Sequence, residues 1–303
     1  MTRVVDLFAG AGGFSTGAVM AGLTVAWAGN HWRAAVDTHA VNHPDTVHAC
    51  QDLQQQDWTQ VPAHDGLLAS PACQGHANAR GKERPHHDAQ RATAWAVVSA
   101  VECHRPAFFV VENVPEFCKW VLYRAWCAAM HALGYALAPM VLDAADHGVA
   151  QHRKRFVLVG TRSKHPIELQ LPKHPHQPAS SVIDFTAGDW ALLRDKVPAT
   201  QARACSGRRR FGDRFLMPYY GGGSGLTGRC LSRPIGTLTT KARWGVVDGD
   251  RMRMVSVDEA REFMGFPSGY HLPENVTDAN EMLGNAVCPP LARDVLAAIR
   301  SAA

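Results

Sequence analysis

Short apolar runs alternate with longer periodic segments through the first 160 residues of this 303-residue chain. The short runs are typical of buried strands, and the longer segments have the spacing of helices that cover a sheet. Strands that alternate with helices predict parallel strand–helix–strand units. We therefore expect an α/β fold with a doubly wound, mostly parallel sheet.

The expected strands are Arg3–Phe8, Thr24–Ala28, Gly66–Ser70, Ala107–Glu112, Leu137–Leu142 and Phe156–Gly160. The expected helices are Phe14–Ala21, Arg33–Asn42, Ala89–Cys103 and Leu122–Leu133. At the end of the chain, Pro289–Ala303 has amphipathic spacing, which predicts a helix that packs back on the sheet.

The character of the sequence changes after Arg162. Residues 163–230 are rich in Pro, Gly, His and Arg and show little periodicity, which predicts a smaller, loop-rich second domain. Between residues 164 and 214 there are nine basic and five acidic residues, an excess of four that equals the net charge of the whole chain, +4. Basic charge gathered in one segment is typical of phosphate contacts, although a solvated surface loop explains it equally well.

Several classes of protein are disfavoured by composition. No apolar run reaches the roughly 18 residues that a membrane helix needs. The chain begins almost directly with a strand-like segment, so we expect no signal peptide and a cytoplasmic protein. The eight cysteines form no Cys-x-x-Cys pair and are interpreted mainly as small buried side chains. His86-His87 and His174-x-His176 are interpreted as polar loop residues, so no metal is expected.

A glycine-rich turn, Asp6-Leu7-Phe8-Ala9-Gly10-Ala11-Gly12-Gly13-Phe14-Ser15, joins the first strand to the first helix. Such a turn at the carboxyl end of a strand lets the backbone approach a cofactor closely. The dinucleotide pattern Gly-x-Gly-x-x-Gly fails, because Ser15 stands where the third glycine belongs, so a nicotinamide oxidoreductase is a distant alternative. A turn that is merely tight is the other interpretation.

Three further motifs lie at strand ends. Ser70-Pro71-Ala72-Cys73-Gln74 and Val111-Glu112-Asn113-Val114 each follow an expected strand, and Gln151-His152-Arg153-Lys154-Arg155 precedes one. A thiolate at the carboxyl edge of the sheet can attack an electrophilic carbon if its pKa is lowered. Without the other motifs, an inert cysteine at a strand end would be the better interpretation of Cys73.

Together these motifs resemble, in order, those of the DNA cytosine-5 methyltransferases. The resemblance continues through Arg233-Pro234-Ile235-Gly236-Thr237-Leu238-Thr239-Thr240, Met264-Gly265-Phe266-Pro267 and Gly284-Asn285-Ala286-Val287. The resemblance covers nearly the whole chain except about residues 163–215. The chain is similar to a phage or bacterial branch of the family that has the motif Ser-Pro-x-Cys. It implies a class I methyltransferase fold and methyl transfer from S-adenosyl-L-methionine to carbon 5 of cytosine in a specific duplex sequence, with S-adenosyl-L-homocysteine as product.

The resemblance also implies roles for individual residues. Cys73 would add to carbon 6 of a flipped cytosine, Glu112 would hold ring nitrogen 3, and Arg155 would donate to the ring carbonyl. The implied catalytic set is Cys73, Glu112, Arg153 and Arg155, with Arg153 and Gln151 supporting the site. The implied cofactor contacts are Phe8, Ala9, Gly10, Gly13, His31, Trp32, Asp52, Pro71, Asn285 and Ala286. The implied DNA contacts are Gln74, Arg80, Lys82, Gln151, Arg208, Arg209, Arg210, Thr239 and Lys241.

The implied catalytic, cofactor-binding domain comprises residues 1–165 plus 281–303, and residues 166–280 would form the target-recognition domain. Asn78–Asp88 is interpreted as a loop that closes over DNA, or as a plain surface loop. Two positions depart from the family pattern. Ala72 replaces a proline, and His31 replaces a carboxylate at the ribose, which predicts weaker or pH-dependent cofactor binding, or a modified cofactor.

Double-stranded DNA is the expected partner of a monomer in the cytoplasm of a bacterium or of a phage-infected host, without membrane association. Two other interpretations stay open: a catalytically silent DNA-binding relative, and an enzyme that acts on RNA. The sequence leaves undecided whether a restriction endonuclease accompanies the protein and which bases it reads.

Overall fold

The computed structural model describes residues 2–72, 90–219 and 228–302. Its contacts divide the chain into two compact units. Unit 1 comprises Met1–Asp143, Lys154–Pro172 and Ala286–Ala303, and unit 2 comprises Ala144–Arg153 and Lys173–Asn285.

Unit 1 contains a seven-stranded sheet with the order β3-β2-β1-β4-β5-β7-β6. The strands are β1 (Arg3–Leu7), β2 (Thr24–Asn30), β3 (Val47–Cys50), β4 (Gly66–Ala69), β5 (Phe108–Asn113), β6 (Ala136–Asp143) and β7 (Lys154–Thr161). Neighbours from β3 to β5 pair in parallel, whereas β7 runs antiparallel to both β5 and β6. The mostly parallel, doubly wound sheet expected from the sequence is thereby confirmed.

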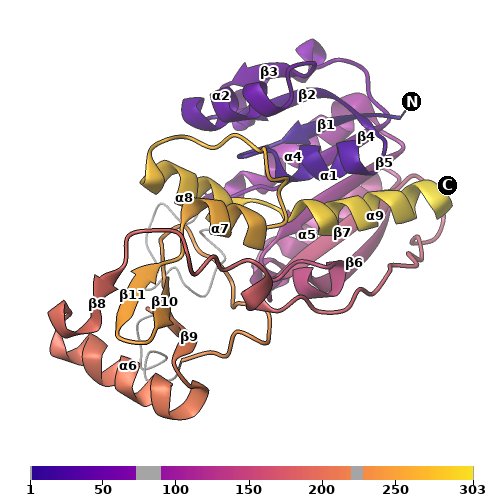
Figure 1. Cartoon of the computed structure of the whole chain (residues 1–303). Helices are drawn as coiled ribbons and strands as arrows, with labels where there is room; N and C mark the ends of the chain where they lie inside the picture. Colours follow the sequence, from indigo (N-terminus) through magenta and orange to yellow (C-terminus); the bar gives the residue numbers. More distant parts are fainter. Residues whose placement is uncertain (1, 73–89, 220–227, 303) are drawn as a thin grey trace. The chain divides into compact units, whose positions relative to one another are not determined.

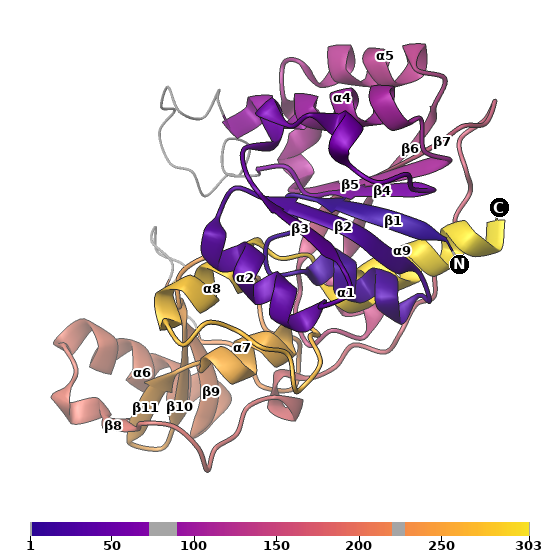
Figure 2. The ribbon, with the colours of Figure 1, turned by 90° about the horizontal axis from the view of Figure 1, so that it is seen from above.

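Helices cover both faces of this sheet (Figure 2). On one face lie α4 (Ala94–His104) and α5 (Tyr123–Ala132), and on the other lie α1 (Gly13–Met20), α2 (Arg33–Asn42) and α9 (Pro289–Ala302). Every residue of β4 and β5 is buried, which explains why β4 and the first four residues of β5 are apolar without polar alternation.

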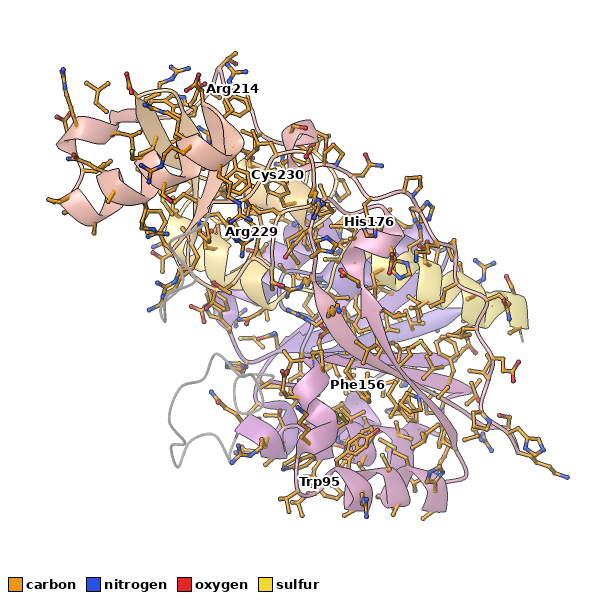
Figure 3. All side chains as sticks on the ribbon, turned by 90° about the horizontal axis from the view of Figure 1, so that it is seen from below. Trp95, Phe156, His176, Arg214, Arg229 and Cys230 are labelled. Carbon is orange, nitrogen blue, oxygen red and sulfur yellow. The ribbon has the colours of Figure 1, made fainter. Side chains whose placement is uncertain are left out.

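The core under α4 and α5 is aromatic. Phe109, Phe117, Trp126 and Phe156 belong to one buried cluster, against which Trp95 packs; Phe156 and Trp95 are labelled in Figure 3. The indole nitrogen of Trp126 donates to the carbonyl of Ala94 over 2.9 Å. Buried indoles need such a partner, so the bond fixes α5 against α4.

Unit 2 contains a smaller antiparallel sheet with the order β8-β11-β10-β9 (Figure 1). Its elements are β8 (Ala191–Leu192), α6 (Pro198–Phe211), β9 (Arg214–Pro218), β10 (Trp244–Asp248), β11 (Arg251–Met254), α7 (Val257–Phe263) and α8 (Val276–Asn285). Helix α6 packs on β9, and a Cβ added at Gly207 would lie 2.2 Å from the ring of Phe215. This glycine lets the helix approach the sheet closely.

The structure corrects three expectations. Strand β3 was not expected, because Val47–Cys50 is short and only half-buried. The loop-rich second unit also contains a helix of 14 residues, α6, which was not expected. Helix α9 packs mainly on α1: Gly17 lies so close to it that an added Cβ would be 2.4 Å from the Cβ of Ala292.

Candidate active site

The glycine-rich turn lies where the strand order of the sheet reverses. Strand β1 has β2 on one side and β4 on the other, and the chain winds outward in both directions from there. The amide of Ser70 donates to the carbonyl of Leu7 over 3.1 Å, so the segments that leave β1 and β4 start side by side. Such a switch point is where open α/β sheets bind ligands.

The backbone of the turn is held in an uncommon conformation. Phe8, Gly10 and Gly12 have φ values of 61°, 54° and 85°. A Cβ added at Gly10 would meet only the carbonyl oxygen of Phe8, at 3.8 Å, so this side of the turn is open to a ligand. Gly13 is closed instead, because an added Cβ would lie 2.1 Å from the carbonyl oxygen of Val287. An open backbone face beside a helix start fits the nucleoside part of a cofactor.

The ends of β2 and β3 add side chains to this edge of the sheet. The buried side chain of Asn30 accepts from the amide of Trp32 over 2.9 Å, which fixes the bend after β2. His31 is exposed and Trp32 is half-buried. Asp52 is exposed and accepts from the amide of Gln54 over 3.0 Å. These positions stay predictions for ribose and adenine contacts.

Two hydrogen bonds hold the residues before Cys73. The side-chain amide of Asn113 donates to the carbonyl of Pro71 over 3.0 Å, and the amide of Ala72 donates to the hydroxyl of Thr93 over 3.1 Å. Proline at position 72 would have no N–H to donate, so the second bond belongs to the alanine that departs from the family pattern. Cys73, Gln74, Arg80, Lys82 and the Asn78–Asp88 loop lie outside the described residues.

Glu112 and Arg155 form an ion pair at the junction of β5 and β7. The Nε atom of Arg155 lies 2.9 Å from Oε1 of Glu112, and the two side chains are 13% and 6% exposed. Antiparallel pairing of β5 with β7 places these residues near each other although 43 positions separate them (155 − 112). A nearly buried charge pair of this kind offers a carboxylate and a guanidinium side by side to a small polar ring.

Gln151 and Arg153 occupy buried positions. Gln151 is fully buried, donates to the carbonyl of Phe263 over 2.9 Å and accepts from the amide of Leu238 over 2.7 Å. Arg153 is buried and donates to the carbonyls of Leu238, over 2.9 Å, and Gly284, over 2.8 Å. Both side chains therefore bind backbone groups of unit 2. The DNA contact of Gln151 and the catalytic role of Arg153 stay predictions, and the bonds to backbone show in addition that both side chains support unit 2.

The other residues expected to meet DNA lie in unit 2. Arg209 and Arg210 are exposed at the end of α6, whereas Arg208 forms ion pairs with Asp213 and Asp250 at 3.6 and 2.9 Å. Lys241 is exposed, and Thr239 donates its hydroxyl to the Lys241 carbonyl over 3.1 Å. Asn285, which ends α8 in unit 2, is exposed, while Ala286 is buried in unit 1.

Sequence reasoning missed a buried polar chain behind the glycine-rich turn. Asp6 bonds the hydroxyl of Ser15 over 2.7 Å, Ser15 bonds Nε2 of His39 over 2.9 Å, and Nδ1 of His39 bonds Nε2 of His48 over 2.8 Å. Burial raises the pKa of Asp6 from 3.8 to about 7, against the lowering effect of the hydrogen bonds from Ser15. Ser15 in the place of a glycine, with His39, His43 and His48 following, was the signal available in the sequence.

Histidines and cysteines elsewhere show no metal chemistry within residues 2–72, 90–219 and 228–302. No group of three or more His, Cys, Asp or Glu side chains there could hold a metal ion. His176 bonds Asp146 over 2.9 Å, and His86-His87 lies outside the described residues. Of the seven described cysteines, all free, only Cys288 is buried, so the expectation of mainly buried cysteines is wrong. No described helix is long and apolar enough to cross a membrane.

Known proteins resemble the chain over its whole length. Type II methyltransferases M.NlaX of Neisseria lactamica and M.NgoPII of Neisseria gonorrhoeae are 26% and 27% identical to it, covering 100% and 98% of this chain and 97% and 95% of theirs. A putative DNA modification methyltransferase encoded within an E. coli prophage has the same fold, with a TM-score of 0.75, 19% identity and coverage of 100% and 99% of the two chains. The structure of DNMT2 of Spodoptera frugiperda is also similar, with a TM-score of 0.71, 18% identity and coverage of 98% of each chain.

A family model supplies the decisive comparison. The model described as C-5 cytosine-specific DNA methylase matches residues 2–197 and 209–301, nearly the entire chain and both of its units. The chain therefore belongs to the C-5 cytosine-specific DNA methylase family.

Proposed function

We propose that Cys73 is the nucleophile with which this DNA cytosine-5 methyltransferase activates its target base. The Glu112–Arg155 ion pair carries the proposal, because it supplies two charged groups of opposite sign at one edge of the sheet. The parallel strand β4 ends at the same edge, four residues before Cys73 in the sequence. Carbon 5 of cytosine is a poor nucleophile. Addition of a thiolate to carbon 6 makes the ring electron-rich at carbon 5.

The methyl donor of this family is S-adenosyl-L-methionine, which supplies an electrophilic methyl group when it is bound. Phe8, Ala9 and Gly10 would hold it along the open side of the turn, with Gly13 at the start of α1 and with His31, Trp32 and Asp52 at the neighbouring strand ends. Pro71, Asn285 and Ala286 complete the proposed set. The open face at Gly10 is the feature that fits a nucleoside.

Each group of the ion pair has a proposed task. Glu112 would hold a proton at ring nitrogen 3, which draws electrons from carbon 6 as the Cys73 sulfur attacks there. Arg155 would donate to the ring carbonyl oxygen, and its fixed fork lets it keep Glu112 as a partner. After methyl transfer, loss of the proton from carbon 5 and release of the Cys73 thiolate restore the aromatic ring.

The target is duplex DNA from which the cytosine must swing out, since carbon 6 is shielded in the stacked helix. Residues 166–280 are proposed to recognise the target sequence, with Arg209, Arg210, Thr239 and Lys241 at the DNA and Gln74, Arg80 and Lys82 beside the flipped base. Arg208 is less available for phosphate, because Asp213 and Asp250 neutralise it. We further propose that the protein is a cytoplasmic monomer. Because its relatives are named Type II methyltransferases, we also propose that a restriction endonuclease accompanies it.

The test is transfer of a labelled methyl group from S-adenosyl-L-methionine to four substrates: duplex DNA, the same duplex with 5-methylcytosine throughout, single-stranded DNA and RNA. Label should appear in the unmodified duplex and be absent from the 5-methylcytosine duplex. Glu112→Gln should lower kcat about 10²- to 10⁴-fold, the range that general acid assistance covers. Preferred labelling of RNA, or unchanged kcat in Glu112→Gln, would contradict the proposal.

A further inference from the structure

The chain of hydrogen bonds behind the glycine-rich turn lies wholly within unit 1. It starts at Asp6 on β1, passes through Ser15 on α1 and His39 on α2, and ends at His48 on β3. Asp6 and Ser15 flank the turn on its two sides, because the turn directly connects β1 to α1. Whatever strengthens the bond between them fixes the turn.

Few other charges act on Asp6. The two strands that pair with β1, β2 and β4, contain no ionisable residue, and α1 contains none either. On α2, Arg33 and Asp37 pair with each other at 3.6 Å and are 70% and 63% exposed. On α9, which packs on α1, Arg293 and Asp294 pair at 2.7 Å, and Arg300 donates to the carbonyl of Ala21. His39, His43 and His48 are therefore the titratable groups that face this chain.

The histidines stay neutral at physiological pH. Burial, together with His43 and His48, lowers the pKa of His39 well below 6.5, and burial lowers those of His43, to about 4, and His48. A neutral imidazole donates at one nitrogen and accepts at the other. The direction of each bond in the chain therefore determines the direction of the next.

When Asp6 is ionised, it accepts both from the amide of Ser15, over 3.1 Å, and from its hydroxyl. The Ser15 oxygen must then accept from Nε2–H of His39, and Nδ1 of His39 must accept from Nε2–H of His48. All donors in the chain point toward the carboxylate, and the proton-free nitrogen is Nδ1 of His48, at the half-buried end.

Protonation of Asp6 reverses the chain. The Oδ1 atom is buried and has no hydrogen-bond partner, so a proton placed there would be an unsatisfied donor. The proton belongs on Oδ2, which then donates to Ser15; Ser15 donates to Nε2 of His39, and Nδ1–H of His39 donates to His48. Nδ1 of His48 now carries the hydrogen, and the ring of His48 has a hydrogen bond to the backbone of Thr46. The net change is a single proton, which is taken up at His48 and leaves Asp6 protonated.

We propose that Ser15, His39 and His48 are positioning residues of the cofactor turn, and that reversal of their hydrogen bonds makes S-adenosyl-L-methionine bind more tightly when Asp6 is ionised. Charge-assisted hydrogen bonds are stronger than neutral ones, so the ionised carboxylate holds α1 on β1 and pre-organises the turn. This inference rests on the proposed position of the cofactor but not on Cys73.

The test is calorimetric titration of the full chain with S-adenosyl-L-methionine at pH 6, 7 and 8, in buffers of different ionisation enthalpy. Because binding favours the ionised carboxylate, the dissociation constant should fall about fivefold from pH 6 to pH 8, a difference that linkage to one proton allows. Binding at pH 7 should release a fraction of one proton. Constant affinity with no proton release would overturn the proposal.

His39→Leu removes both the acceptor that the Ser15 hydroxyl needs when Asp6 is protonated and the N–H from which the Ser15 oxygen accepts when Asp6 is ionised, so the chain of hydrogen bonds can no longer reverse. Its affinity for S-adenosyl-L-methionine should therefore change less than about twofold from pH 6 to pH 8. His43→Leu is the matched control: it alters the same face of α2, and His43 bonds Thr16 outside the chain, so the parent's pH dependence should persist. Equal effects of the two variants would refute the assignment.

A second variant tests the proposal if His39→Leu does not fold. His48→Leu cuts the chain at its half-buried end and should remove the pH dependence as His39→Leu does. If labelled methyl transfer fails but the binding affinities depend on pH as expected, only the proposed catalytic step is wrong. If methyl transfer occurs but the affinities do not depend on pH in this way, only the inference about the hydrogen-bond chain is wrong.

Discussion

At the scale of single residues, the candidate site depends on partners that bring distant parts of the chain together. Thr93 and Asn113 hold the two residues before Cys73, and Arg155 holds Glu112. The motifs in the sequence identified Glu112 and Arg155, and Asn113 belongs to the same motif. Thr93 and His39 could not be found in that way, because their roles depend on how α2 and the segment before α4 pack on the sheet.

Thr93→Val should leave S-adenosyl-L-methionine affinity unchanged and lower kcat about threefold to tenfold. The substitution preserves shape but removes the acceptor for the amide of Ala72, at a cost typical of one hydrogen bond, about 1 kcal/mol. Calorimetry and single-turnover methyl transfer measure the two quantities, and Thr93→Ser, which keeps the hydroxyl, should restore kcat. A larger loss in Thr93→Ser than in Thr93→Val would refute this role.

The raised pKa of Asp6 predicts how the stability of the fold depends on pH. Its pKa is raised from 3.8 to about 7, so the folded protein holds a proton that the unfolded chain releases between these values. This carboxyl therefore makes the free energy of unfolding fall as pH rises from about 4 to about 7 and leaves it unchanged above. Urea unfolding at pH 5, 6, 7 and 8 should show a shallower fall in Asp6→Asn than in the parent. Parallel profiles would contradict the raised pKa.

At the scale of elements, the strands β1, β2, β4, β5, β6 and β7 and the helices α1, α2, α4, α5 and α9 agree with the sequence patterns to within a few residues. The patterns could not reveal that β7 is antiparallel, because burial on both faces makes a strand look the same in either direction. Helix α6 was missed because Pro198, Gly207 and its basic residues hide the helical period.

The packing of α1 on α9 predicts the effect of Gly17→Ala. The new Cβ would lie 2.4 Å from that of Ala292 and 2.7 Å from the carbonyl oxygen of Pro289. Overpacking costs about 1–3 kcal/mol, which outweighs the gain of up to about 1 kcal/mol in helix propensity. Thermal unfolding should therefore occur several degrees lower. Gly269→Ala, where nothing lies within 4 Å, should leave Tm nearly unchanged.

Helix α6 carries the prediction for DNA binding. Arg209→Ala with Arg210→Ala should weaken binding of all duplexes alike and reduce the slope of log K against log salt by about 2, because each arginine neutralises one phosphate. Arg208→Ala should have a smaller effect on the slope, since Asp213 and Asp250 already neutralise this guanidinium. Fluorescence anisotropy over a salt series distinguishes these variants from the parent. A dominant effect of Arg208 would contradict the assignment.

At the scale of the whole molecule, a mostly parallel α/β unit and a smaller second unit were expected from composition and strand alternation. The structure assigns Ala144–Arg153 to unit 2. Residues 151 and 153 explain why, since their side chains bind the backbone of residues 238, 263 and 284. Contacts separated by more than 80 positions are not encoded in any local pattern, so the sequence motif could not reveal that these two residues also support unit 2.

The central claim is covalent catalysis by Cys73, and the most direct measurement is trapping on a duplex with 5-fluorocytosine at the target position. Fluorine at carbon 5 cannot leave as a proton does, so the adduct accumulates. The parent, incubated with S-adenosyl-L-methionine, should form a protein–DNA complex that survives denaturation and whose linked peptide contains Cys73, while Cys73→Ser forms none. A stable adduct in Cys73→Ser, or full methyl transfer by that variant, would contradict the account.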